Sequence, residues 1–191
     1  MEKVTLILGS QSKPRKAILE EEGFEFSICV AEGDEYFDEN LPYAENLKNI
    51  SRAKADEVMG KTDSYGHRVI VCADQMINFE GKMYGKPKSM DEARATIKSF
   101  LGKNVKACVG NTIFEVNNGK IIREICTVDE AVLEVESVSD EELENYLENG
   151  NPFNKCGGIN VKQTPFVRLV EGKMSTARGI TVELLKDFMK A

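Results

Sequence analysis

Short apolar segments alternate with longer segments of helical period in the first half of the chain. VTLIL (residues 4–8), FSICV (residues 26–30) and RVIVCAD (residues 68–74) are apolar and contain β-branched residues, as buried strands do. Between them, residues 14–22 begin with proline and stop before a glycine, and residues 42–60 carry an apolar stripe, as helices do. This alternation predicts a mixed α/β protein.

The second half of the chain contains turn and capping signals. Glu80-Gly81 and Asn117-Asn118-Gly119 separate strand-like segments and predict hairpins. Serine with glutamate three residues later, at Ser89 and again at Ser139, predicts two further helix starts. Further strands are expected at residues 157–161 and 166–170, and a helix at residues 180–189. We expect one domain, residues 1–191, with a mixed twisted sheet, flanking helices and a cleft between two lobes.

Composition excludes several classes of protein. The formal net charge of −7 opposes binding to polymeric nucleic acid, which needs a continuous basic face. No apolar run is long enough to span a membrane, and MEKVTLIL is too short for a signal peptide, so a cytoplasmic location without membrane contact is expected. The five cysteines form no CxxC pair and are expected to be reduced.

Polar side chains gather where the predicted strands end, which is where ligands collect in open α/β sheets. The predicted helix 42–60 adds a lysine, Lys54, on its apolar stripe, where a charge is costly unless it reaches an anion or water. The candidates in order of their loops are Ser10, Ser12, Lys13 and Arg15 in the first, Asp34 and Glu35 in the second, Asp74 in the third and Lys86 in the fourth.

This set of residue types suits phosphate chemistry. Hydroxyls, backbone N–H groups at a helix start and basic side chains neutralise phosphate oxygens. Carboxylates hold Mg²⁺ or a similar cation and can orient an attacking water. The one histidine, His67, lies in the loop-like stretch SYGHR, where it is not placed to form a Ser-His-Asp triad, and neither GxxxxGK[ST] nor GxGxxG occurs. Metal-assisted hydrolysis of a phosphoanhydride is the reaction that these residues support best.

Plainer interpretations of the same residues stay open. Asp74 could be a helix-capping or turn aspartate, Lys54 could extend its ammonium to water, and the polar loops could be structural connectors.

The order of short motifs resembles the Maf family of nucleotide pyrophosphatases over nearly the whole chain. The motifs are LILGSQSKPRKAIL, GDE, ISRAKA, VCADQ, YGKP, NKCGG and EGKMSTARGI. The resemblance implies an ITPase-like fold, often in a homodimer, and hydrolysis of nucleoside triphosphates to monophosphates and pyrophosphate with a divalent metal, Mg²⁺ or Mn²⁺. Modified or noncanonical nucleotides and some canonical pyrimidine nucleotides are the implied substrates.

The resemblance also assigns roles. Ser10 and Arg15 match the family's phosphate loop, and Ser12 and Lys13 lie in the same loop. Asp74 matches the carboxylate that activates water. Lys54 matches the family's helix lysine and Lys86 the lysine of its GKP motif, and both would stabilise charge on the phosphates. The acidic pair Asp34 and Glu35 matches carboxylates that would bind the metal, and Asp74 would be a third metal ligand.

Two regions depart from the family pattern. In the first loop, Lys13 replaces a proline and Pro14 replaces an arginine, so one phosphate contact is lost or moves to Lys13. In the late segment, Lys162 takes the usual place of a glutamine and Gln163 follows it; both are candidates for base recognition. Gln75, directly after Asp74, resembles the residue at this place in the branch of the family that favours 7-methyl-GTP, and not the branch that favours dTTP and UTP.

The altered first loop leaves a second hypothesis from another class. A protein that keeps the fold and binds nucleotides, but has lost turnover, would act as a nucleotide sensor or regulatory protein.

Overall fold

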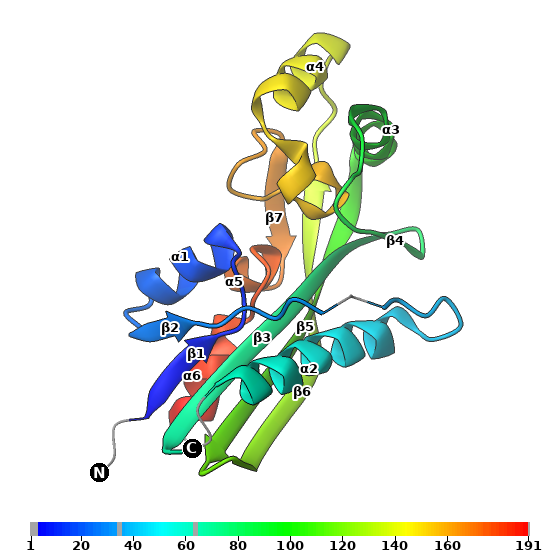
Figure 1. Ribbon diagram of the computed structural model, residues 1–191. Coiled ribbons are helices and arrows are strands. Elements are labelled where there is room, and N and C mark those ends of the chain that lie inside the picture. The colour runs from blue at the N-terminus through cyan, green and yellow to red at the C-terminus, as the bar shows by residue number, and fades with distance from the viewer. Residues whose placement is uncertain (1–3, 34–35, 63–64, 191) are drawn as a thin grey trace. The chain divides into compact units, whose positions relative to one another are not determined.

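The computed structural model describes residues 4–33, 36–62 and 65–190 (Figure 1). Its strands are β1 (Thr5–Leu8), β2 (Phe26–Ile28), β3 (His67–Phe79), β4 (Lys82–Tyr84), β5 (Lys103–Asn117), β6 (Lys120–Val135) and β7 (Val167–Glu171). Its α-helices are α1 (Lys13–Glu21), α2 (Tyr43–Lys61), α3 (Met90–Phe100), α4 (Asp140–Asn149), α5 (Met174–Ala177) and α6 (Val182–Lys190). The predicted α/β class is confirmed.

The strands form one mixed sheet in the order β2-β1-β3-β5-β6-β7, and β4 pairs with β3. β1 is parallel to both of its neighbours, with Ile7 opposite Ser27 on β2 and opposite Ile70 on β3. β4 and β7 join their neighbours in antiparallel fashion, and a register shift between Val132 and Leu133 interrupts the β6–β7 pairing. The parallel strands are connected through helices, because a tight hairpin cannot join two parallel strands.

The chain divides into two compact units that are discontinuous in sequence. Unit 1 contains residues 1–74, 109–129 and 179–191, and unit 2 contains residues 75–108 and 130–178. A single domain over residues 1–191, with a cleft between lobes, stays a prediction.

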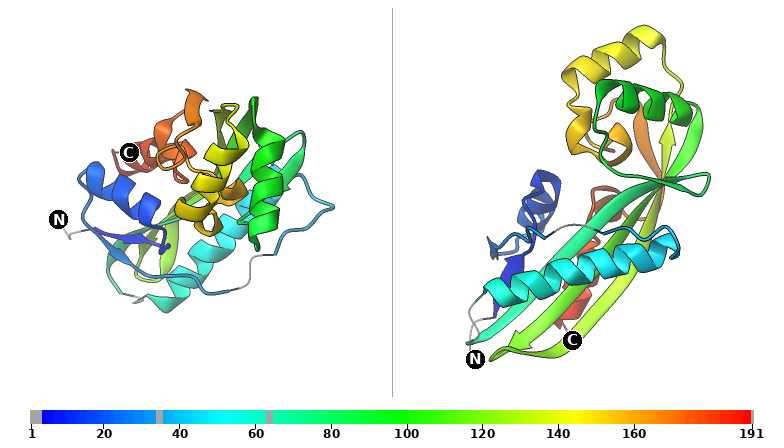
Figure 2. Two further views of the ribbon diagram at one scale, coloured as in Figure 1. Left: turned by 90° about the horizontal axis from the view of Figure 1, so that it is seen from above. Right: turned by 45° about the vertical axis from the view of Figure 1, so that its right-hand side comes forward.

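In unit 1, alternate residues of the strands face opposite helices, as the two-residue period of a strand requires. Leu6 and Leu8 of β1 pack in a cluster with residues of α1 and α6. Ile7 packs instead with Ile70 and with Val58 of α2. Figures 1 and 2 show α2 on one side of these strands and α6 on the other. Burial on both faces explains why the sequence of these strands is almost continuously apolar.

In unit 2, α3 and α4 contribute to a single apolar cluster with the strands. Both helices begin at the predicted caps. Ser89 Oγ accepts the amide of Glu92, and Ser139 forms a reciprocal capping box with Glu142. The hairpin turn between β3 and β4 places Glu80 and its following glycine at positive φ, as predicted from this pair.

The strand expected at residues 157–161 is wrong. Gly157 and Gly158 have φ values of 61° and 74°, which a strand cannot accommodate, and Cys156–Gly158 is a 3-10 turn. The short helix α5 was not expected from the sequence.

No helix in the described ranges combines the length and the apolar character that crossing a membrane requires.

Candidate active site

The predicted site residues divide between the two units. In unit 1, hydrogen bonds of Arg15 hold the loop between β1 and α1. Arg15 Nη1 donates to Ser10 Oγ at 3.1 Å, and Nε donates to the carbonyl of Gly179 at 2.7 Å. The amide of Ser12 also donates to Ser10 Oγ, at 3.2 Å. The structure therefore brings Ser10, Ser12 and Arg15 together, with Ser10 buried, while Lys13 is exposed at the helix start.

The start of α1 suits an anion. Pro14 lies in the first turn, where its missing N–H costs no hydrogen bond, and no acidic residue occupies that turn. The positive end of the helix dipole therefore lies at the loop that carries Ser10 and Ser12, and Arg15 lies in the first turn of the same helix.

Gly9 leaves room for a buried thiol beneath this loop. A Cβ at position 9 would lie 2.1 Å from Cys72 Sγ. Cys72 lies on the neighbouring strand β3 and is fully buried, and this burial raises the pKa of its thiol to about 12. The thiol is therefore a packing group and not a nucleophile at neutral pH.

Lys54 and Asp74 form a mostly buried ion pair. Lys54 Nζ lies 2.6 Å from Asp74 Oδ1, and the two side chains are 15% and 11% exposed. The lysine on the apolar stripe of α2 thus reaches an anion, the carboxylate of Asp74, while its role in a nucleotide site stays a prediction. Asp74 lies inside β3, because the strand continues to Phe79 and does not end at Asp74 as predicted.

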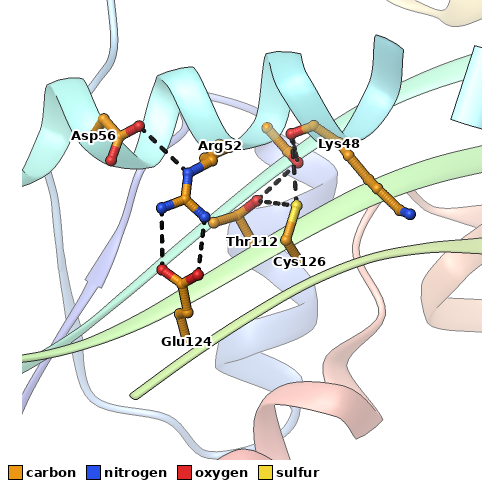
Figure 3. Close-up of polar contacts among 7 residues, drawn as sticks. Lys48, Arg52, Asp56, Thr112, Glu124 and Cys126 are labelled. Carbon is orange, nitrogen blue, oxygen red and sulfur yellow. Dashed lines mark hydrogen bonds and ion pairs between the residues drawn. The ribbon is translucent and has the colours of Figure 1, made fainter. Parts of the chain in front are cut away.

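Helix α2, which carries Lys54, is also tied to the β5–β6 hairpin (Figure 3). Arg52 donates two hydrogen bonds to the carboxylate of Glu124, both at 3.1 Å, and these bonds lower the pKa of Glu124. Ser51 Oγ and Thr112 Oγ1 share a hydrogen bond of 2.9 Å, and Thr112 Oγ1 donates to Cys126 Sγ. These ties fix the helix from which Lys54 reaches Asp74.

Two of the predicted metal ligands, Asp34 and Glu35, lie outside the described residues. The residues before them are anchored by α2, since Glu57 accepts the amides of Glu32 and Gly33 at 2.8 and 3.0 Å. The amide of Glu32, together with Lys61 and the Gly33 amide, lowers the pKa of Glu57 to about 2. Within the ranges that the structure describes, no three metal-binding side chains cluster. Asp74, a hard oxygen donor, suits a divalent cation by its chemistry.

Unit 2 contains Gln75, Lys86, Lys162 and Gln163. Gln75 Nε2 donates to the carbonyl of Ala177 at 3.2 Å. Lys86 is exposed on the loop after β4, and Lys162 and Gln163 are exposed on a turn that follows the 3-10 segment. The 3-10 segment contacts the segments that carry Gln75 and Lys86, through the Cys156 side chain in the first case and the Gly157 amide in the second.

Sequence reasoning missed the polar contacts that support this turn. Lys155 is buried, and its Nζ donates to Tyr146 Oη at 3.3 Å and to the carbonyl of Gly150. A lysine between Asn154 and Cys156 resembles a surface loop residue, so composition gives no signal for its burial. Only the NKCGG motif marked the position, and that motif carried no role for the lysine.

Comparison with known proteins gives a consistent result over the whole chain. The model of the Maf-like protein family matches residues 5–191. A dTTP/UTP pyrophosphatase of Agathobacter rectalis is 28% identical, and the match covers 94% of this chain and 93% of that protein. Proteins of the same description from Bacillus pumilus and Chromobacterium violaceum are 29% and 30% identical, and each match covers 96% of this chain and 96% or 94% of the relative.

Among solved structures, a nucleoside-triphosphatase / dITP/XTP pyrophosphatase of Mycobacterium abscessus aligns with a TM-score of 0.39 and 9% identity. The alignment covers 98% of this chain and 92% of that one.

Proposed function

The chain belongs to the Maf-like protein family, and from that premise we propose that it is a nucleoside triphosphate pyrophosphatase. The reaction would release a nucleoside monophosphate and pyrophosphate. The observation that carries the proposal is the buried pair of Lys54 and Asp74, 2.6 Å apart in unit 1, which also holds the loop of Ser10 and Arg15. A carboxylate and a cation of this kind suit an attacking water and a phosphate oxygen.

In the proposed mechanism, Asp74 accepts a proton from water as the water oxygen attacks the α-phosphorus. The bond from that phosphorus to the bridging oxygen then breaks, and its electron pair leaves with pyrophosphate. Arg15 and Lys54 stabilise the negative charge that develops on the phosphate oxygens, and Lys86 acts on the leaving group. Ser10 and the start of α1 hold the phosphate chain.

A divalent cation, Mg²⁺ or Mn²⁺, would be held by Asp74 with Asp34 and Glu35. When bound, it would neutralise charge on the triphosphate. The carboxylate of Asp74 supports this role by its chemistry, while the two acidic-loop residues stay predictions.

The base of the substrate is proposed from two indications that differ. The relatives described as dTTP/UTP pyrophosphatases favour a pyrimidine triphosphate. Gln75 after Asp74 favours 7-methyl-GTP instead, and Lys162 and Gln163 are proposed to read the base. The homodimer that the family implies and the cytoplasmic location expected from the sequence also stay predictions.

A nucleotide sensor without turnover is the second candidate. It is favoured by the first loop, where Pro14 stands at the family's arginine and Lys13 is exposed at the start of α1. Such a protein would bind a triphosphate and leave it intact.

The test is pyrophosphate release from dTTP, UTP, 7-methyl-GTP and the common nucleotides in the presence of Mg²⁺ or Mn²⁺. We expect turnover with at least one of them, and we expect Asp74→Asn to reduce kcat by about 1,000-fold or more while nucleotide binding persists, since general-base catalysis is worth 10²–10⁴-fold. Binding would be measured by calorimetry. Asp187→Asn, which changes an exposed aspartate of α6, is the matched control and should keep full activity.

Tight binding without release by the wild-type protein would favour the sensor. Full turnover by Asp74→Asn would remove Asp74 from the mechanism.

A further inference from the structure

Unit 2 buries a lysine that the proposed mechanism does not use. Lys155 is 8% exposed, and burial alone lowers the pKa of its ammonium. Its Nζ donates to the carbonyl of Gly150 and to Tyr146 Oη, and it lies 5.2 Å from the centroid of the Tyr146 ring. Among the residues that the structure describes, no carboxylate is paired with Lys155. A buried cation without such a partner is destabilising, and an apolar side chain of similar size would fill the same space at a lower free energy. A purely structural role therefore explains this lysine poorly.

The hydroxyl of Tyr146 connects the lysine to the turn that carries Lys162 and Gln163. Tyr146 Oη donates its one proton to the carbonyl of Gly158 at 2.7 Å. It must therefore accept both the bond from Lys155 and the bond of 2.9 Å shared with Thr164 Oγ1.

Thr164 continues the connection into the turn. Its Oγ1 accepts the amide of Asn160 at 2.8 Å, and its own amide donates to the carbonyl of Asn160 at 2.9 Å. Lys162 and Gln163 are the exposed residues between these two anchors. The position of the turn thus depends on Tyr146, which Lys155 holds.

The residues next to Lys155 bind the two other segments that carry candidate residues of unit 2. Cys156 Sγ donates to the carbonyl of Gln75 at 2.9 Å. The amide of Gly157 donates at 2.7 Å to the carbonyl of Gly85, which directly precedes Lys86. Gly157 has φ +61°, and a Cβ there would approach Ile77 and Phe100 to about 3 Å, so this close contact requires glycine.

We infer that Lys155 is a positioning residue for nucleotide recognition. Through Tyr146 and the adjoining residues Cys156 and Gly157, it fixes Gln75, Lys86 and the turn of residues 160–164 in one arrangement. This inference rests on the proposed function, because it concerns how the same substrate is recognised.

The test is the kinetics of Lys155→Met, which keeps most of the apolar stem and removes the ammonium. We expect KM for the preferred nucleotide to rise by about tenfold, as the loss of a hydrogen bond to a charged group predicts, and kcat to fall by less. The ratio of kcat/KM between the best and the second-best nucleotide should also fall, because the base-reading turn is displaced. Simple destabilisation would lower the active fraction equally for all nucleotides and leave KM and this ratio unchanged.

Tyr146→Phe provides a second variant that keeps the ring and removes only the hydroxyl. It should change KM and selectivity in the same direction, and the double variant should be less impaired than the two single effects combined, since both act through one network. Lys106→Met is the matched control, because Lys106 in the same unit binds Glu130 at the surface.

The outcomes separate the two proposals. An active wild type with unchanged KM and selectivity in both variants would overturn the positioning role alone. A wild type that releases pyrophosphate from no nucleotide would contradict the proposed function. If Lys155→Met does not fold, Tyr146→Phe decides.

Discussion

At the residue scale, the packing of the first loop depends on the lack of a side chain at Gly9. The space where a Cβ would stand is taken by the thiol of Cys72, 2.1 Å away, and by Val58, 3.1 Å away. We expect Gly9→Ala to lower the free energy of unfolding by about 1–3 kcal/mol through overpacking. Removing the sulfur in Gly9→Ala/Cys72→Ala should restore a large part of this loss.

Urea unfolding of the two single variants and the double variant measures this coupling. Cys72→Ala alone should be mildly destabilising, because it leaves a small cavity. Additive effects in the double variant would show that the methyl group and the sulfur do not compete for the same space.

Residues in regular positions were the easiest to predict. Lys54 was singled out because it interrupts an apolar stripe, and its ion pair with Asp74 explains how a charge is accommodated at that position. Lys155 was not found, because its burial depends on contacts with Tyr146 and Gly150 that no local pattern encodes. Burial of a polar side chain is set by tertiary packing, which a single sequence does not display.

At the scale of elements, the position of α2 depends on a close approach to β5. A Cβ at Gly110 would lie 2.2 Å from the carbonyl oxygen of Leu47 in the helix backbone, which cannot yield as a side chain can. We expect Gly110→Ala to destabilise the protein by about 3 kcal/mol. It should also lower kcat/KM of the folded fraction by about 100-fold, because a shift of about 1 Å in α2 would misplace Lys54.

Thermal unfolding and steady-state kinetics measure both effects. Gly60→Ala is the control in the same helix, since no atom lies within 4 Å of its Cβ position. That change should stabilise the protein by about 0.5–1 kcal/mol and leave turnover intact. If Gly110→Ala and Gly60→Ala had the same effects on thermal unfolding and on kcat/KM, the position of α2 would not depend on its close approach to Gly110.

Elements with local signals were predicted well. The caps at Ser89 and Ser139 and the glycine turns depend on a few neighbouring residues, and the structure confirms them. The strand expected at residues 157–161 failed because hydrogen bonds to distant carbonyls and two left-handed glycines decide that segment. An apolar stretch of a few residues does not reveal such partners.

For the molecule as a whole, the mixed α/β fold and two lobes were expected from the sequence, while the residues at which the two units divide were not. Strands β3, β5 and β6 contribute residues to both units, so no composition shift marks a boundary along the chain. The predicted roles of Asp34 and Glu35 depend on the family resemblance, and they lie outside the described residues.

Removal of divalent metal should affect catalysis and leave the fold intact. The described ranges hold no cluster of three metal-binding side chains, and their apolar cores need no ion. We expect EDTA to abolish pyrophosphate release and to change the Tm by less than about 2 °C, whereas a structural metal would contribute folding energy directly. Added Mg²⁺ or Mn²⁺ should restore turnover. A large drop in Tm with EDTA would instead indicate a metal that supports the fold.

The order in which unit 1 is assembled has a consequence for synthesis on the ribosome. Its first strand β1 and helix α1 are synthesised before α6, at residues 182–190, which completes the core around Leu6 and Leu8. Arg15 likewise reaches its partner, the carbonyl of Gly179, only after 164 further residues have been synthesised. Until α6 has left the ribosome, the strands of unit 1 therefore lack part of their apolar cover. During that interval these strands are candidates for chaperone binding.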